Sequence, residues 1–163
     1  PLYEQALALF REAGHLPGIA MTLNNLADTA YRCGNFVQAE SLAKASIAVS
    51  REAKQPILTC NALITVGAAA CMQGDLRRAH AALHEALHTS RDGGYQLTLT
   101  DTIVGLADVA TASGDPLRAA RLLGLCADLL TSGGTTVIAV HPETSAVYMD
   151  HAALLIPADT PIT

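Results

Sequence analysis

The chain has 163 residues, of which 50% are hydrophobic and 15% charged, and its formal net charge is −5 at pH 7. Its 10 Lys and Arg residues are scattered without a basic stripe, which excludes direct nucleic-acid binding by this segment because a phosphate backbone needs several converging cations. The uncharged run from Ile57 to Met72 is shorter than the roughly 20 residues of a membrane span and no secretory signal opens the chain, so we expect a cytoplasmic protein without membrane contact.

A period of 40 residues organises most of the chain. Gly-Asn or Gly-Asp pairs recur at residues 34, 74 and 114, with one alanine four residues before each glycine and another five residues after it. Because many independent positions share this period, we interpret it as a structural repeat. The sequence predicts a partial unit at 1–14 and full units at about 15–54, 55–94 and 95–134.

Start and stop signals divide each full unit into two helices. In chain order, helices are expected over residues 2–13, 18–33, 36–52, 57–73, 76–92, 96–113 and 116–131. Each repeating glycine is expected to end a helix in the left-handed conformation, and the Asn or Asp after it to cap the next helix. The alanines on either side of the glycine predict close packing of the two helices across the turn.

The tail at 135–163 leaves the period. We expect a linker, then a capping helix from about Pro142 to Ile156 and a frayed end. A helical solenoid needs an atypical terminal element to cover its last apolar face, and the capping helix is the simplest one.

The repeat pattern L-x2-L-A/G-x2-A-x3-G-N/D-x3-A resembles the tetratricopeptide repeat over residues 1–134, with Leu23, Leu26, Ala27, Gly34 and Asn35 as one instance. The resemblance implies an all-α, TPR-like right-handed superhelix of antiparallel helical hairpins with a C-terminal capping helix, although the family's common unit has about 34 residues. The stretches TLNNLAD at 22–28 and LRAARLLG at 117–124 are similar to the sensor arrays of bacterial LuxR-type and related NTPase-containing transcriptional regulators.

If the register of the tetratricopeptide repeat transfers, the groove residues lie on the first helix of each unit, on the concave face. They are Asn24, Asn25, Asp28, Tyr31 and Arg32 in the first full unit, Thr65, Ala68, Cys71 and Met72 in the second, and Gly105, Asp108 and Thr111 in the third. Asn side chains can hydrogen-bond a peptide backbone, and a Cys/Met surface adapts to apolar side chains. The alternative is that these residues contact the neighbouring helix, and the sequence leaves both interpretations open.

One helix carries His80, His84 and His88 at positions i, i+4 and i+8, a spacing that can hold Zn²⁺ or Ni²⁺. These histidines directly follow the apolar positions of their helix, so a solvated helix flank is the favoured interpretation. The equivalent slot of the preceding unit holds Glu40, which we expect on the same flank.

The cysteines at 33, 60, 71 and 126 show no CxxC spacing and fall at apolar positions of the predicted helices. We therefore expect reduced thiols that behave as small hydrophobic residues rather than disulfides or metal ligands. No nucleophile elbow, P-loop or paired-carboxylate site is present, so neither enzymatic activity nor a cofactor is expected.

These features predict an interaction or sensor module that binds a protein, a peptide or a small effector within a larger bacterial transcriptional regulator. The alternative is a self-assembly scaffold that forms a homo-oligomer. The helix at 2–13 has no hairpin partner in the chain, and a second copy would cover its apolar face. A metal protein that uses the histidine row is the third hypothesis.

Overall fold

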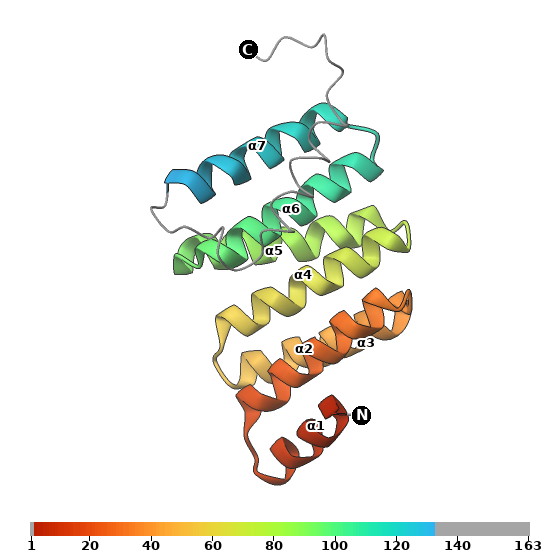
Figure 1. Cartoon of the computed structure of the whole chain (residues 1–163), viewed down its shortest axis with the longest axis vertical. Coiled ribbons are helices and arrows are strands. Elements are labelled where there is room, and N and C mark those ends of the chain that lie inside the picture. Colours follow the sequence, from red (N-terminus) through yellow and green to blue (C-terminus); the bar gives the residue numbers. More distant parts are fainter. Residues whose placement is uncertain (1, 133–163) are drawn as a thin grey trace.

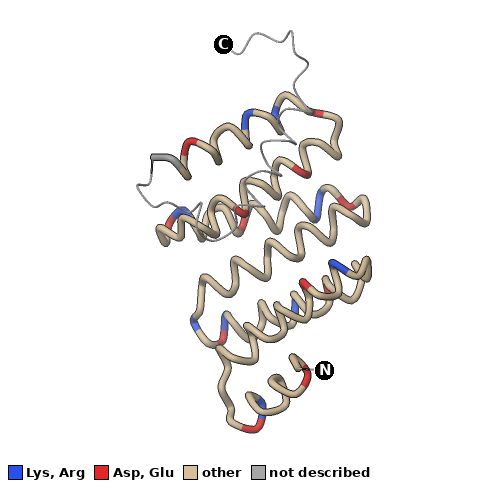
Figure 2. Tube along the Cα trace, viewed as in Figure 1, with Lys and Arg blue, Asp and Glu red and all other residues tan. Residues whose placement is uncertain are grey.

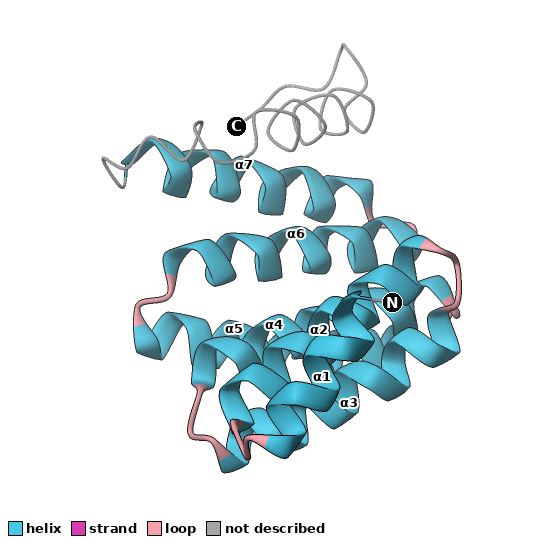
Figure 3. Cartoon of the chain, turned by 60° about the horizontal axis from the view of Figure 1, so that its bottom comes forward, coloured by secondary structure: helices cyan, strands magenta, loops and turns pink. Residues whose placement is uncertain are grey.

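The computed structural model describes residues 2–132, which form seven helices joined by short loops (Figures 1 and 3). The helices are α1 (Leu2–Glu12), α2 (Leu16–Arg32), α3 (Phe36–Glu52), α4 (Pro56–Met72), α5 (Leu76–Gly93), α6 (Gln96–Ala112) and α7 (Pro116–Ser132). Three hairpins, α2–α3, α4–α5 and α6–α7, follow one another along the long axis (Figure 1). This confirms the predicted all-α, tetratricopeptide-like fold. The linker, capping helix and frayed end predicted at 135–163 lie outside the described residues.

The predicted helix bounds agree with the observed ones to within two residues. The largest difference is at α2, which begins at Leu16 rather than at residue 18. His15 caps this helix, since its Nδ1 accepts a hydrogen bond of 3.0 Å from the backbone N–H of Gly18. Histidine is not one of the residues that usually mark a helix start, which is why the sequence placed this start too late.

The uncharged run at 57–72 forms most of α4, which contacts α2, α3, α5 and α6. Its apolar residues are therefore covered by neighbouring helices of the same chain. Within residues 2–132, no helix has the length and apolar character that crossing a membrane requires.

The turn inside each hairpin follows the predicted pattern. Gly34, Gly74 and Gly114 have φ values of 78°, 77° and 76°, a left-handed conformation that glycine adopts without a Cβ penalty. The N–H of the next residue donates to the carbonyl of the alanine four positions before the glycine, at 2.9–3.0 Å. The carboxylates of Asp75 and Asp115 then cap α5 and α7, whereas Asn35 occupies the N-cap of α3 without a side-chain bond.

Two further contacts recur in every hairpin and hold its helices together. The predicted alanine pairs are in the core, with residue 30 near 39, residue 70 near 79 and residue 110 near 119. At the opposite end, a side chain donates a hydrogen bond to a carbonyl 26 residues away. These bonds are Ser46 to Ala20 at 2.7 Å, Cys60 to Ala86 at 3.8 Å and Cys126 to Thr100 at 3.2 Å.

Leu83 of α5 connects the second hairpin to the third. It has no exposed surface, and a Cβ built on Gly67 of α4 or Gly105 of α6 would lie 2.6 or 2.7 Å from its side chain. Only glycine at both positions leaves room for this leucine, because real Cβ atoms do not approach that closely. The prediction that Gly105 lines a ligand groove is therefore wrong, since Gly105 packs against Leu83.

The placement of Glu40 also differs from the prediction. Its side chain is only 7% exposed, whereas we expected it on a solvated flank. Oε1 accepts hydrogen bonds of 2.7 Å from Lys44 and from Arg78 of α5, and Oε2 accepts one of 3.0 Å from Gln73 after α4. A buried carboxylate requires such partners, and residues 33 and 38 positions away in the sequence provide two of them.

One turn between hairpins carries backbone strain. Gly14 and Gly94 have φ values of 63° and 68°, but the equivalent position in the middle of the chain holds Lys54, whose φ is 52°. The Cβ of a non-glycine residue is crowded against its own backbone in this region. The repeat thus departs from glycine at one of three equivalent turns, although the backbone conformation there favours glycine.

Replacing Lys54 by glycine is expected to stabilise the protein. It removes a left-handed penalty of roughly 1–2 kcal/mol, partly offset by about 0.5–1 kcal/mol from the greater freedom of glycine in the unfolded chain. We expect the free energy of unfolding, measured in urea, to rise by about 0.5–1 kcal/mol for Lys54→Gly. Lys54→Ala keeps the Cβ and should show no gain, and equal effects of the two substitutions would contradict the strain argument.

The buried Glu40 predicts a specific dependence of stability on pH. Burial alone raises the pKa of Glu40, but hydrogen bonds from Lys44 and Gln73 and the charges of Lys44 and Arg78 outweigh it, so the pKa lies below its ordinary value of 4.5. Because the pKa of Glu40 is lower in the folded protein than in the unfolded chain, its carboxylate contributes its full stabilisation above the unfolded-state pKa. This contribution is lost as the pH falls through the folded-state pKa.

Glu40→Gln removes the charge that pairs with Lys44 and Arg78, and we expect it to reduce the free energy of unfolding by about 1–2 kcal/mol at pH 7. The loss is limited to this size because both cations are half-exposed and can be hydrated instead. The difference from the wild type should shrink as the pH falls below about 5 and through the lowered pKa of Glu40. Urea unfolding at several pH values measures it. The exposed Glu85→Gln is the control and should change little, and a Glu40→Gln effect independent of pH would contradict this account.

Candidate functional site

The residues predicted to line a groove lie on α2, α4 and α6, the first helices of the three hairpins. These helices pack against one another in sequence, α2 on α4 and α4 on α6. We call the surface on which they carry these residues the inner face, and α3, α5 and α7 the outer helices. The stacking of the hairpins thus brings side chains together that are about 40 and 80 positions apart in the sequence.

Tyr31 of α2 lies within the electrostatic reach of residues from all three hairpins. Its phenol is half-buried, and its pKa is raised first by burial and then by the negative charges of Asp108, Cys71 and Asp28. These neighbours come from α6, α4 and α2, so each hairpin contributes to the surroundings of one side chain. The ring of Phe36 lies 5.5 Å from that of Tyr31, measured between centroids, in a tilted arrangement.

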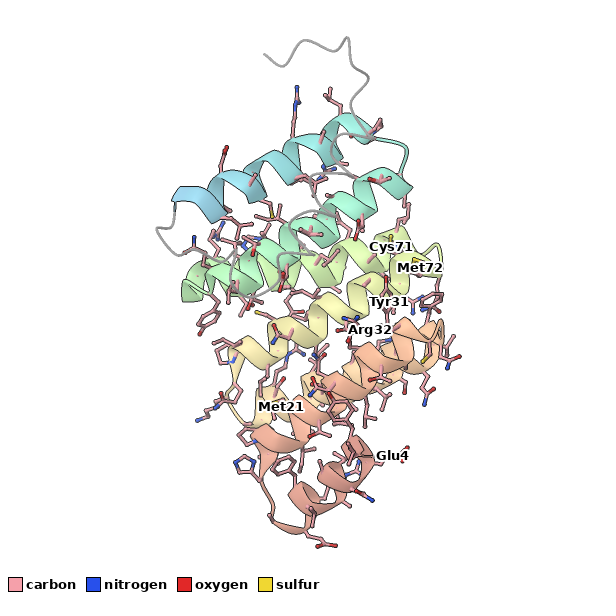
Figure 4. The ribbon with its side chains drawn as sticks, viewed as in Figure 1. Glu4, Met21, Tyr31, Arg32, Cys71 and Met72 are labelled. Carbon is pink, nitrogen blue, oxygen red and sulfur yellow. The ribbon has the colours of Figure 1, made fainter. Side chains whose placement is uncertain are left out.

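Around this cluster the surface is partly charged and partly apolar. Arg32 Nε donates to Asp28 Oδ2 at 2.7 Å, and both side chains are exposed. Met72 lies beside Cys71 at the end of α4 with 56% of its surface exposed. Figure 4 shows Tyr31, Arg32, Cys71 and Met72 at the same end of the stacked helices. The predicted residues of this end are therefore neighbours in space.

Two of the other predicted residues, Asn24 and Thr65, contact each other between hairpins. Thr65 Oγ1 lies 3.3 Å from Asn24 Oδ1, to which it donates, and 3.2 Å from the carbonyl of Asn61. Asn24, Asn25 and Thr65 are all half-buried. For the pair Asn24 and Thr65 the alternative interpretation, contact with the neighbouring helix, therefore holds.

All four cysteines carry free thiols. Cys60 and Cys126 are buried and Cys71 is half-buried, and none of the four cysteines forms a disulfide. Burial and the nearby charge of Asp101 raise the pKa of Cys126 to about 11, and burial also raises the pKa of Cys60 and Cys71. The prediction was wrong for Cys33, which is exposed at the C-cap of α2 rather than packed inside it.

The histidine row lies on an exposed flank of α5, as the favoured interpretation predicted. The rings of His80 and His84 are 5.7 Å apart between centroids, and those of His84 and His88 are 4.5 Å apart. Arg91 Nη2 lies 3.2 Å from His88 Nδ1. Among residues 2–132, no group of three or more His, Cys, Asp or Glu is arranged to hold a metal ion.

Charge is distributed unequally between the inner and the outer helices (Figure 2). α4 carries no charged residue at all, and α2 and α6 together carry Asp28, Asp101, Asp108 and Arg32. The outer helices hold most of the Lys and Arg of the described chain. The inner face is therefore negatively charged, and the outer helices present the cations.

A second surface feature was not predicted from the sequence. A hollow of about 420 Å³ lies between α3 and α5, with Leu63 and Val66 of α4 at its floor. A smaller one of about 270 Å³ lies between α5, α6 and the start of α7. The signal that could have revealed the larger hollow is Ala82, which stands where the neighbouring repeats have Leu42 and Leu122.

Residues 18–92 match the family model of the tetratricopeptide repeat. The match spans nearly all of the first two full hairpins, α2 to α5, and α6–α7 repeats their pattern beyond it. No curated protein matches the chain. Repeats of this family generally mediate protein–protein interaction or scaffolding, and such all-helical repeats are typically non-catalytic.

The surroundings of Tyr31 can be tested by titration. Asp108→Asn removes a negative charge that opposes ionisation of the phenol, so we expect the raised pKa of Tyr31 to fall. It should not return fully to its ordinary value, because burial is the largest cause of the shift. The tyrosinate absorbance of each variant, minus that of its Tyr31→Phe counterpart, gives this pKa in the range where circular dichroism is unchanged. Asp92→Asn on α5 is the control, and an equal shift for both variants would contradict the assigned neighbours.

Proposed function

We propose that this chain is a protein-interaction module that binds a segment of a partner protein on its inner face, with the cluster around Tyr31 at the centre of the contact. The observation that carries the proposal is that residues of three successive hairpins, Asp28, Cys71 and Asp108, lie near enough to Tyr31 to raise its pKa. A segment bound there touches all three repeats at once. The general use of tetratricopeptide repeats in protein–protein interaction supports this function.

The chemistry of the inner face favours a partner segment with both basic and apolar side chains. Asp28 and Asp108 provide carboxylates for a Lys or Arg of the partner, and Arg32 limits how much positive charge the site accepts. Exposed Met72 and the neighbouring Cys71 offer a polarisable, adaptable surface for an apolar side chain. Tyr31 combines a large contact area with a hydrogen-bonding hydroxyl, a combination that is enriched at interfaces.

We further propose that the module is the sensor array of a larger bacterial transcriptional regulator of the LuxR type and acts in the cytoplasm. The similarity of residues 22–28 and 117–124 to such arrays supports this setting. The coding sequence on either side of the segment tests it. A P-loop NTPase or a helix-turn-helix domain in the same reading frame is the expected result, and a free-standing reading frame would refute it.

Self-assembly is the second candidate function, and one observation favours it. Leu2, Tyr3 and Leu9 of α1 are exposed although α1 packs on α2. A scaffold that associates with a second copy would bury this apolar surface. The binding function on the inner face and association through α1 use different surfaces, so either can hold without the other.

Selection from a displayed library of random peptides tests the binding function. We expect enriched peptides to carry Lys or Arg next to an apolar residue, and Asp28→Asn with Asp108→Asn to weaken them about tenfold or more in calorimetric titration, as loss of charged contacts at an interface does. The matched control is Glu52→Gln with Asp92→Asn, which removes the same charge from the outer helices. Enriched peptides without basic residues, or equal affinity of both double variants, would count against the proposed site.

A further inference from the structure

The smaller hollow lies where the second hairpin meets the third, between α5, α6 and the start of α7. It is more enclosed than the hollow between α3 and α5. Its volume of about 270 Å³ is slightly below the roughly 300–1,000 Å³ of pockets for drug-sized ligands, so it fits only a small molecule. We call it the junction hollow. Its polar lining residues are Arg77, His80, Ser113, Asp115 and Arg118.

The repeat places the junction hollow at the position that the Glu40 network occupies one unit earlier. Between the first and second hairpins, the buried carboxylate of Glu40 accepts hydrogen bonds from Gln73 and Arg78. The positions 40 residues further on all line the junction hollow, and they hold His80 for Glu40, Ser113 for Gln73 and Arg118 for Arg78. The later junction therefore keeps the arginine of the network and lacks its carboxylate.

The loss of this carboxylate leaves Arg118 without its counterion. Arg78, the equivalent residue, pairs with Glu40 at 2.7 Å and with Asp75 at 3.0 Å. Arg118 forms no ion pair with any residue of the range 2–132. Asp115, which corresponds to Asp75, accepts a hydrogen bond of 3.1 Å from the backbone N–H of Arg118 instead. The guanidinium at this position is thus exposed and available.

Arg77 of α5 adds a second cation to the junction hollow. It is exposed and, among the described residues, takes part in no ion pair. Its charge acts on Asp75, but that carboxylate is already paired. The lining of the hollow holds two arginines and one carboxylate, that of Asp115, which leaves one net positive charge with His80 neutral. Around Glu40, by contrast, two cations face two carboxylates.

We propose that the junction hollow binds the carboxylate group of a small organic acid, which takes the place of the missing glutamate. The guanidinium of Arg118 donates hydrogen bonds to this group, as Arg78 does to Glu40, and charged arginine–carboxylate bonds of this kind are among the strongest in proteins. Arg77 supplies a second positive charge, and an N–H of His80 is a further donor. The enclosed volume limits the remainder of the acid to a few carbon atoms.

Binding of the acid connects the second hairpin with the third. His80 and Arg77 belong to α5 and Arg118 to α7, so the ligand joins two outer helices as the Glu40 network joins α3 and α5. A ligand that binds only the folded chain raises its stability. None of these residues belongs to the cluster around Tyr31, so the site does not depend on the function proposed for the inner face.

A series of small acids is the probe for this site. Acetate, malonate, succinate and glutarate are titrated at pH 7 and constant ionic strength into the full 163-residue chain, with chloride and the neutral succinamide as controls. We expect at least one acid to shift the Nε–Hε resonances of Arg77 and Arg118 in a saturable way, with a Kd of about 1 mM or tighter. The same acid should raise the melting temperature.

Two substitutions localise the binding. His80→Glu restores the carboxylate that Glu40 provides one unit earlier, so we expect it to raise the melting temperature of the free chain and to abolish acid binding. Arg118→Gln should weaken the acid about tenfold or more. The matched controls are His88→Glu, which lies about 12 Å further along α5, and Arg121→Gln on α7. Both positions are exposed and outside the lining, and both controls should bind within about twofold of the wild type.

The proposal is overturned if no acid of the series saturates these resonances, or if succinamide shifts them equally. It is also overturned if His80→Glu and Arg118→Gln bind like the wild type, or if an Asp-containing peptide binds at the site and no free acid does. Since Arg118 is exposed, Arg118→Gln leaves the core unchanged, and the test holds even if His80→Glu folds poorly.

Discussion

Leu83 of α5 fills the space between Gly67 of α4 and Gly105 of α6 and has no exposed surface. A Cβ at either glycine would overlap this side chain. The distance between the second and third hairpins is therefore set by the Leu83 side chain, which fits because Gly67 and Gly105 have none. The closeness of α4 to α6 follows from this fit. The influence of Asp108 on Tyr31 across three helices depends in turn on that spacing. A substitution that increased the spacing between the second and third hairpins would move Asp108 away from Tyr31 without changing any residue of the inner face.

The repeat also distributes charged residues unequally between the first and the second helices. The first helices of the hairpins, α2, α4 and α6, pack side by side and carry few charged residues. The carboxylates on α2 and α6 therefore dominate the charge of the inner face. Second helices carry the cations and are joined by Glu40 with Arg78 and by Arg51 with Glu85. Each ion pair connects successive repeats. Of the two, the pair that involves the buried Glu40 contributes more to stability, because the exposed pair of Arg51 and Glu85 is screened by water.

Departures from the repeat are more informative than the repeat itself. Lys54 takes the left-handed conformation that Gly14 and Gly94 adopt at the equivalent turns, and Ala82 replaces a leucine. Both changes lower stability by local physical rules. Natural sequences break such rules most often at functional or strained sites. Ala82 leaves a hollow between α3 and α5, whereas nothing in the structure explains Lys54.

The sequence by itself determined the helices, their turns and the repeat unit, because caps, left-handed glycines and apolar spacing act over a few neighbouring residues. It also placed Tyr31, Cys71, Met72 and Asp108 on one face, since a 40-residue period fixes which helix positions align. Only the tertiary structure decided that Glu40 is buried, that Gly105 packs on Leu83 and that a groove opens beside Ala82. These features depend on the volumes and charges of side chains from separate helices, 33 to 38 positions apart in the case of Glu40. Periodicity aligns such positions but does not determine how their side chains fill the space between them.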